Sequence, residues 1–195
     1  MRDKRGKNHT VRRLGALGAV AAAFLAAAPI ASASCFGSSR TASQLTEAQF
    51  EQTILCLVNE RRKDKGRRPL RPNPKLQRVA DRHSADMVNR GYFGHTSPTG
   101  SEFADRILST GYTRRARRYV LGENLVWGRG ATSTPAYLVT AWMNSPPHRA
   151  NLMRKRFREI GVGAVRGTPV NARDSAGITL SNEYGYRKRG QRKRR

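Results

Sequence analysis

Apolar side chains recur at helical spacing in the first clearly patterned part of the chain. These positions lie three or four residues apart, which is the period of a helix with one buried face: Phe50, Ile54, Leu57 and Val58. Thr46, followed three residues later by Gln49, has the form of a capping box. The pattern predicts a helix that begins after Thr46, runs to about Lys65 and stops at Gly66.

A second helical pattern follows a proline-rich turn. Asn73 is a residue type that caps helices, and Pro74 suits the first helical turn. The expected buried face consists of Leu76, Ala80, His83 and Met87. Because a histidine on such a face is usually packed and hydrogen-bonded in the core, we interpret His83 as structural.

The two other histidines of the central region are predicted to lie on loops. The segment "GYFGHTSPTG" is rich in turn-forming glycine and contains His95. A later helix, capped by Thr134, is expected to end before "PPHRAN", which places His148 in the connection that follows. Between them, "SEFADRILSTGY" has the pattern of a short helix, and "ENLVWG" that of a strand or an extended buried segment.

The pattern changes near the end of the chain. "EIGVGAV" and "GITLSNEYGY" have the composition of strands, and a loop of Gly, Pro, Asn and Asp joins them, which predicts an antiparallel pair. Helices therefore come early and strands late, with no internal repeat. This order favours an α+β or three-layer fold over a doubly wound parallel sheet.

The first 33 residues read as a signal peptide. A basic start, the apolar stretch 14–30 and the small residues that follow it are typical of exported proteins. A membrane anchor is the alternative, but the stretch is shorter than the roughly 20 residues that span a bilayer. We expect a secreted, extracellular protein without a transmembrane segment in its mature part, organised as an N-terminal linker at 34–45, one domain at 46–186 and a basic, disordered tail at 187–195.

The chain has only two cysteines, Cys35 and Cys56. An exported protein meets an oxidising environment, in which cysteines pair. We therefore predict a disulfide between them, with two unpaired thiols as the alternative.

The chain is strongly basic, with 38 Lys and Arg residues against 13 Asp and Glu and a formal net charge of +25. The basic residues gather in three runs, at 61–75, 114–118 and 187–195. Such a charge favours anionic partners, whether nucleic acid, an acidic envelope polymer or anionic lipid. No aromatic residue is interleaved in these runs, so base stacking on them is not expected and nucleic acid is the least favoured partner.

Two histidines and one carboxylate are candidates for chemistry. His95, Glu123 and His148 come from three separate segments, and imidazole and carboxylate groups suit zinc and similar divalent cations. Spacing alone does not bring them together, because the chain has no HExxH or similar motif. A serine nucleophile, Ser97 or Ser145 beside a histidine, is a further alternative, but the chain lacks a G-x-S-x-G elbow.

Five fragments in order closely resemble the bacterial branch of the CAP superfamily. They are "HSADM", "FGHTSPTG", "GENLVWG", "AWMNSPPHRANLM" and "REIGVG". This superfamily, also called the SCP domain, includes cysteine-rich secretory proteins, antigen 5 allergens and pathogenesis-related plant proteins. The resemblance covers about residues 50–186.

The resemblance implies a three-layer α-β-α sandwich with a central antiparallel sheet and a cleft lined by two histidines and two acidic residues. Carried over to this chain, the cleft residues are His95, Glu123 and His148. The fourth position departs from the family pattern, because Ser145 stands where eukaryotic members have a glutamate. Ser145 can still hydrogen-bond a histidine or a water, while two other carboxylates, Glu159 and Glu183, are not assigned by spacing.

The function expected from this resemblance is that of a secreted, non-catalytic binding module. Its cleft can hold a divalent cation such as zinc, with His95, His148 and Glu123 as ligands, and bind a lipid-like ligand or an anionic envelope polymer. The alternative is a metal-assisted hydrolase in which the same three residues hold the ion and activate water.

Overall fold

A computed structural model describes residues 35–190 of the chain. The predicted signal peptide and the last five residues of the predicted tail lie outside the described residues. Within them, five α-helices pack on a four-stranded sheet: α1 (Glu47–Asp64), α2 (Pro74–Arg90), α3 (Phe103–Ser109), α4 (Pro135–Asn144) and α5 (Pro146–Met153). Two short 3-10 helices, η1 (Ala42–Gln44) and η2 (Gly130–Ser133), complete the element order.

The sheet has the strand order β1-β3-β4-β2. Its strands are β1 (Arg71–Pro72), β2 (Ala116–Arg129), β3 (Glu159–Arg166) and β4 (Gly177–Arg189). The three long strands are antiparallel, with β4 between β2 and β3, while the two-residue β1 runs parallel to β3. The predicted strand pair near the end of the chain is therefore confirmed, and β1 makes the sheet mixed rather than wholly antiparallel.

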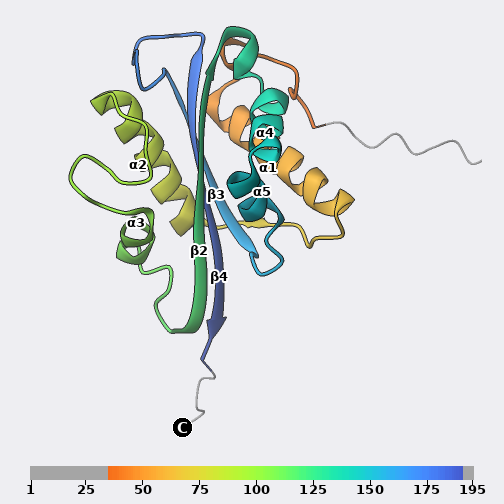
Figure 1. The fold of residues 1–195 in the computed structure, drawn as a ribbon, viewed down its shortest axis with the longest axis vertical. Helices are drawn as coiled ribbons and strands as arrows, with labels where there is room; N and C mark the ends of the chain where they lie inside the picture. Colours follow the sequence, from red (N-terminus) through yellow and green to blue (C-terminus); the bar gives the residue numbers. More distant parts are fainter. Residues whose placement is uncertain (1–34, 191–195) are drawn as a thin grey trace, which may run out of the picture. The chain divides into compact units, whose positions relative to one another are not determined.

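The helices cover both faces of the sheet, as the α+β three-layer prediction required. Figure 1 shows α2 and α3 on one side of the strands and α1, α4 and α5 on the other. The larger hydrophobic core contains Phe50, Trp142 and Tyr184, and the smaller one contains Leu76 and Ile107. No helix in the described part of the chain has the length and apolar character needed to cross a membrane.

The first two helices begin where the sequence predicted. The Thr46 hydroxyl accepts a hydrogen bond from the backbone N–H of Gln49 at 3.2 Å, and the Gln49 side chain accepts one from the backbone N–H of Thr46 at 2.9 Å. Asn73 Oδ1 accepts from the backbone N–H of Lys75 at 3.0 Å. These contacts satisfy amide groups that a helix start would otherwise leave without partners.

Two glycines of β3 allow α2 to lie directly on the sheet. A Cβ atom built at Gly161 would lie 2.1 Å from the carbonyl carbon of Leu76, and one at Gly163 would lie 2.2 Å from that of Ala80. Only a residue without a side chain fits at these positions. The close approach fixes the height of α2 above the sheet, and with it the position of His83.

The connection after α4 differs from the prediction. Pro146 and Pro147 end α4 but also begin α5, so His148 lies in the first turn of a short helix and not on a loop. Proline is well suited to that place, because its ring fixes a helical φ and its missing N–H has no partner in a first turn anyway.

The ends of the domain are more structured than their composition indicated. Cys35 and Cys56 form a disulfide, with a Cα–Cα distance of 5.7 Å, and Ala42 and Leu45 of the segment expected to be a linker are buried. At the other end, β4 continues to Arg189, past the domain end expected at residue 186. There the Arg187 guanidinium lies 4.5 Å from the ring centroid of Tyr112 and pairs with Glu159.

Candidate functional site

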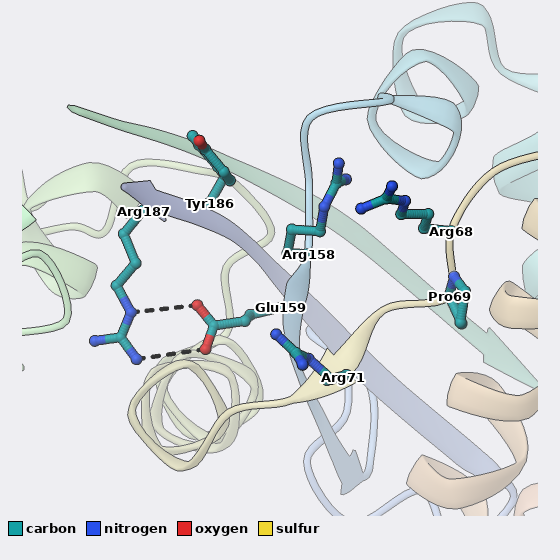
Figure 2. A pocket seen from close by; sticks show the side chains of 7 residues that line it. All are labelled: Arg68, Pro69, Arg71, Arg158, Glu159, Tyr186 and Arg187. Carbon is teal, nitrogen blue, oxygen red and sulfur yellow. Dashed lines mark hydrogen bonds and ion pairs between the residues drawn. The ribbon is translucent and has the colours of Figure 1, made fainter. Parts of the chain in front are cut away.

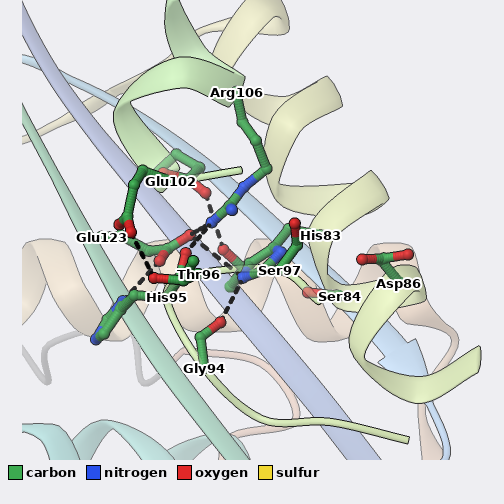
Figure 3. Close-up of polar contacts among 12 residues, drawn as sticks. His83, Ser84, Asp86, Gly94, His95, Thr96, Ser97, Glu102, Arg106 and Glu123 are labelled. Atoms are coloured by element: carbon green, nitrogen blue, oxygen red, sulfur yellow. Dashed lines mark hydrogen bonds and ion pairs between the residues drawn. The ribbon is translucent and has the colours of Figure 1, made fainter. Parts of the chain in front are cut away.

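Glu123 is the centre of a buried polar cluster on the sheet face covered by α2 and α3. It lies on β2, at the edge of the sheet, directly opposite Glu183 of β4, and its side chain is fully buried. Figure 3 shows the histidines and the arginine that surround this carboxylate. They come from α2, from the loop after α2 and from α3.

Three basic side chains contact Glu123. His95 Nδ1 lies 2.6 Å from Oε1, Arg106 Nη2 donates to Oε2 at 2.8 Å, and His83 Nε2 lies 3.6 Å from Oε2. Burial alone would raise the pKa of Glu123, but its polar neighbours, His95 first among them, hold that pKa below the ordinary value. Glu123 is therefore ionised, and both of its oxygens are already engaged.

Glu183 is the uncharged partner in this carboxylate pair. It is fully buried; Oε1 accepts a hydrogen bond from Ser181 at 3.1 Å, and Oε2 has no partner among the described residues. Burial, followed by the charge of Glu123, raises the pKa of Glu183 well above its usual range. Two facing carboxyl groups in one buried site do not both ionise, so Glu183 keeps its proton.

Arg106 fixes the loop that carries His95. Besides Glu123, its guanidinium donates to the backbone carbonyls of Ser101 at 2.7 Å and His95 at 2.9 Å. His83 supports the same loop, because its Nε2 lies 3.1 Å from the carbonyl oxygen of Gly94. His83 is thus buried and hydrogen-bonded, as predicted, but it also borders the site.

His95 presents one nitrogen away from the cluster. Its side chain is 50% exposed, and the hydrogen bond with Glu123 raises its pKa. When His95 is neutral, Nδ1 carries the hydrogen donated to Glu123, so Nε2 holds the free lone pair. In many metal-binding histidines a carboxylate accepts a hydrogen bond from the nitrogen that does not bind the metal. This contact orients the ring and makes the other nitrogen more basic.

His148 stands with Ser145 at the junction of α4 and α5. His148 Nδ1 lies 2.8 Å from the Ser145 hydroxyl oxygen, so Ser145 is the hydrogen-bond partner of this histidine. Burial, and then the charge of His95, lower the pKa of His148, which keeps the ring neutral at neutral pH.

Two asparagines join α5 to the edge strand that carries Glu123. Asn124 donates to the carbonyl of His148 at 3.1 Å, and Asn151 donates to the carbonyl of Glu123 at 3.0 Å. Asn151 also donates to Asn124 Oδ1 at 3.0 Å. His148 therefore has a fixed position relative to β2, although it belongs to the opposite helical layer from His95.

An apolar groove begins at His148. It has a volume of about 290 Å³ and is lined by Phe93, Leu125, Val126, Trp127, Ala141, Trp142, Ser145 and His148. Phe93 and Trp127 are 47% and 36% exposed, which is unusual for side chains of this size. Ser145 and His148 are its only polar lining residues.

The donor groups fit a divalent cation only in part. Among residues 35–190, the only three potential ligand atoms within 4.8 Å of one another belong to Cys35, Cys56 and Glu60, and the two cysteines are joined in the disulfide. Glu123 is engaged with His95 and Arg106. No such group in that range includes His95, His148 or Glu123.

Sequence reasoning did not identify three members of the cluster. Arg106 was noticed only as part of a helical pattern, His83 only as a core residue, and Glu183 had no assigned place. In the sequence Glu123 and Glu183 each have an asparagine neighbour, Asn124 and Asn182, which does not indicate that the two strands are adjacent.

Comparison with known proteins identifies the family of this chain. The model of the CAP family, described as the cysteine-rich secretory protein family, matches residues 55–178. YkwD of Bacillus subtilis is 36% identical over 131 residues, which cover 67% of this chain and 48% of that protein. The chain thus corresponds to less than half of this relative's length.

Two solved structures resemble the fold. An extracellular protein of Bacillus anthracis that contains an SCP domain superposes with a TM-score of 0.56 at 26% identity, covering 74% of this chain and 44% of that one. An outer surface protein of Borrelia burgdorferi superposes with a TM-score of 0.61 at 21% identity, covering 74% of this chain and 97% of that one.

Proposed function

Because the chain belongs to the CAP family of cysteine-rich secretory proteins, we propose that it acts outside the cell as a ligand-binding module. An extracellular protein of Bacillus anthracis and an outer surface protein of Borrelia burgdorferi share its fold. The signal-peptide pattern at 1–33 and the Cys35–Cys56 disulfide support the same location.

The proposed ligand has an apolar body and one polar end, as a fatty acid does. The observation that carries this proposal is the groove in which apolar walls meet Ser145 and His148 at one side. Burial of an acyl chain against Phe93 and Trp127 would remove apolar surface of both partners from water. A polar head group would then have the Ser145 hydroxyl and the His148 ring within its reach.

A divalent cation is the second proposed ligand of the site. Neutral imidazole nitrogens are good zinc ligands, and the Nε2 atoms of His95 and His148 have no hydrogen-bond partner among the described residues. Such an ion would supply positive charge beside the groove, which would strengthen binding of an anionic head group.

The hydrolase alternative has weaker support. Activation of a water molecule calls for a general base within hydrogen-bond reach. Glu123 is committed to His95 and Arg106, and Glu183 is buried and protonated. Neither carboxylate is placed to take a proton from water at the surface, so we favour binding over catalysis.

Fluorescence titration with a dansyl-labelled fatty acid tests the proposal. We expect saturable binding to the mature protein and a loss of about 1 kcal/mol, or about fivefold in affinity, for Phe93→Ala, since this ring is only half covered before binding. Tyr137→Ala is the matched control, because Tyr137 is 53% exposed and does not line the groove. Absent binding, or an equal loss in both variants, would contradict the groove as the ligand site.

A further inference from the structure

A separate cavity is lined mainly by arginine. It has a volume of about 620 Å³, and Arg68, Arg71, Arg158 and Arg187 line it together with Glu159 and Tyr186. These residues come from the turn before β1 and the first residue of β1, from the start of β3 and the residue before it, and from the end of β4 (Figure 2). None of them lines the groove beside His148.

The only carboxylate of this cavity is already neutralised. Glu159 accepts hydrogen bonds of 2.7 Å from the Tyr112 hydroxyl and from Asn73 Nδ2, and Arg187 pairs with both of its oxygens at 3.3 and 3.4 Å. Burial alone would raise the pKa of Glu159, but these partners hold it below its ordinary value. Glu159 and Arg187 therefore cancel each other's charge and leave three arginines uncompensated.

Those three arginines retain free donor groups. Arg68 and Arg71 make no side-chain hydrogen bond or ion pair with any residue in 35–190, and Figure 2 draws an interaction only between Arg187 and Glu159. Arg158 uses Nη1 for the carbonyls of Lys155 and Phe157, at 2.6 and 2.7 Å. Its Nε and Nη2 remain available to a ligand.

The backbone holds these like charges together. The N–H of Arg71 donates to the carbonyl of Arg158 at 3.0 Å, and the N–H of Arg158 donates to that of Gly185 at 3.0 Å. Arg62, which is fully buried, donates to the carbonyls of Arg68 at 2.9 Å and Phe157 at 3.5 Å. Hydrogen bonds therefore fix both backbone segments that carry the three arginines. The segments cannot move apart to reduce the repulsion between the three positive charges.

We propose that this cavity binds the phosphate groups of an anionic polymer. Guanidinium groups match phosphate oxygens in a two-point geometry that lysine cannot provide. The volume exceeds that of a single phosphate and falls in the range of sites for small organic ligands, so a phosphate with part of its attached sugar or polyol would fit. The large exposed apolar residues of the described chain all lie outside the cavity lining, which favours a soluble polymer over a membrane surface.

Calorimetric titration of the mature protein with inorganic pyrophosphate is the direct test. We expect saturable binding that falls at least tenfold in Arg68→Gln/Arg71→Gln. The matched control is Arg78→Gln/Arg82→Gln, which removes the same charge from exposed positions on α2 and should change the affinity less than twofold. Equal losses in the two double variants would show that only net charge matters and would overturn the proposal.

Further measurements separate phosphate from other anions. Arg71→Lys keeps the charge but loses the planar donor pair, so it should still weaken pyrophosphate binding several-fold. Citrate should bind more weakly than pyrophosphate, and equal affinity would overturn the assignment to phosphate. Soluble polyphosphate should compete with pyrophosphate. Binding to phosphatidylglycerol vesicles that depends on Arg68 and Arg71, without any response to soluble pyrophosphate, would overturn the polymer in favour of a membrane.

Discussion

Glu123 and His95 are joined by a contact of 2.6 Å between Oε1 and Nδ1, although 28 residues separate them in the chain. The carboxylate is buried and the imidazole is half exposed. Glu123 therefore fixes from the inside which nitrogen of His95 reaches solvent. Removing the charge of Glu123 should therefore change the pKa of His95, even though the two residues would still be neighbours.

Glu123→Gln tests this relationship. The amide can still accept a hydrogen bond, but it no longer stabilises a protonated imidazole, so the pKa of His95, followed by NMR titration, should fall. Loss of the charge that orients His95 should also lower zinc affinity by about 10-fold to 100-fold. Asp64→Asn, which changes a carboxylate on α1 outside the site, should leave both quantities unchanged. An unaltered His95 pKa in Glu123→Gln would show that the contact has no electrostatic effect.

Replacing either His95 or His148 should weaken zinc binding without lowering the stability of the fold. His95→Ala and His148→Ala should each reduce zinc affinity at least about tenfold, because each removes a proposed ligand. Both side chains are partly exposed, so thermal unfolding should change little. Calorimetric titration and melts of the same samples give the answer. If both variants lose melting temperature but keep their zinc affinity, the histidines are structural.

Zinc binding should depend on pH through His95. A protonated imidazole cannot bind a metal. Because its pKa is raised, His95 takes up its proton above the ordinary value of about 6.5, whereas His148, whose pKa is lowered, stays neutral. Zinc affinity measured across this range should begin to fall above about pH 6.5 as the solution is acidified. In Glu123→Gln the same fall should begin at a lower pH.

Replacing the buried carboxyl group of Glu51 should stabilise the protein, and the gain in stability should depend on pH. Burial raises its pKa to about 7, so between the unfolded value of 4.5 and this raised value the unfolded chain loses its proton while the folded one keeps it. Folding therefore loses stability as pH rises through this window. Glu51→Gln should match the wild type near pH 4 and be more stable by about 1 kcal/mol near pH 8, a value reduced for solvent screening at this partly exposed site.

Thermal melts at the two pH values measure the effect. The substituted amide would keep an acceptor for the N–H of Ala164, which donates to Glu51 at 3.1 Å. Glu60→Gln, on the same helix, is the control for the loss of one carboxylate, and the gain of Glu51→Gln near pH 8 should exceed any change that it shows. Equal stability of Glu51→Gln and wild type at the alkaline end would contradict the raised pKa.

The disulfide predicts a loss of stability when it is removed. Cys35 and Cys56 close a loop with a sequence separation of 21, and the chain-entropy model assigns about 3 kcal/mol to a loop of this size. Chemical denaturation of a Cys35→Ser/Cys56→Ser variant of the mature protein should show that loss. Intact-mass measurement without reduction should show the pair bonded in the wild type, and two free thiols there would remove the bridge.

Local chemistry made the helix starts predictable. Thr46 with Gln49, and Asn73 with Pro74, act on amide groups a few residues away, and such contacts can be read directly from the sequence. The start of α5 was less accessible, because a pair of prolines can end one helix or begin another. The first residues of β2 were missed for a different reason: their arginines gave the segment the composition of an exposed loop, while pairing with the end of β4 makes it a strand.

The site could be predicted only as far as the family resemblance reaches. His95, Glu123 and His148 carry recognisable motifs, and their surroundings follow from the packing of α2, α3 and α5 around β2. Arg106 and Glu183 have no motif, and each is a charged residue type that composition assigns to the surface. Arg106 contacts Glu123 and Glu183 lies opposite it, and no single stretch of sequence reveals either relationship.

Because β2 lies at the edge of the sheet, the proposed ion would connect the two helical layers. His95 belongs to the loop that joins α2 to α3, and His148 to the first turn of α5 in the opposite layer. An ion bound by both histidines would cross-link the two layers of the sandwich. Binding and release of that ion would then narrow or widen the apolar groove, whose walls include Phe93 from the first layer and Trp142 from the second.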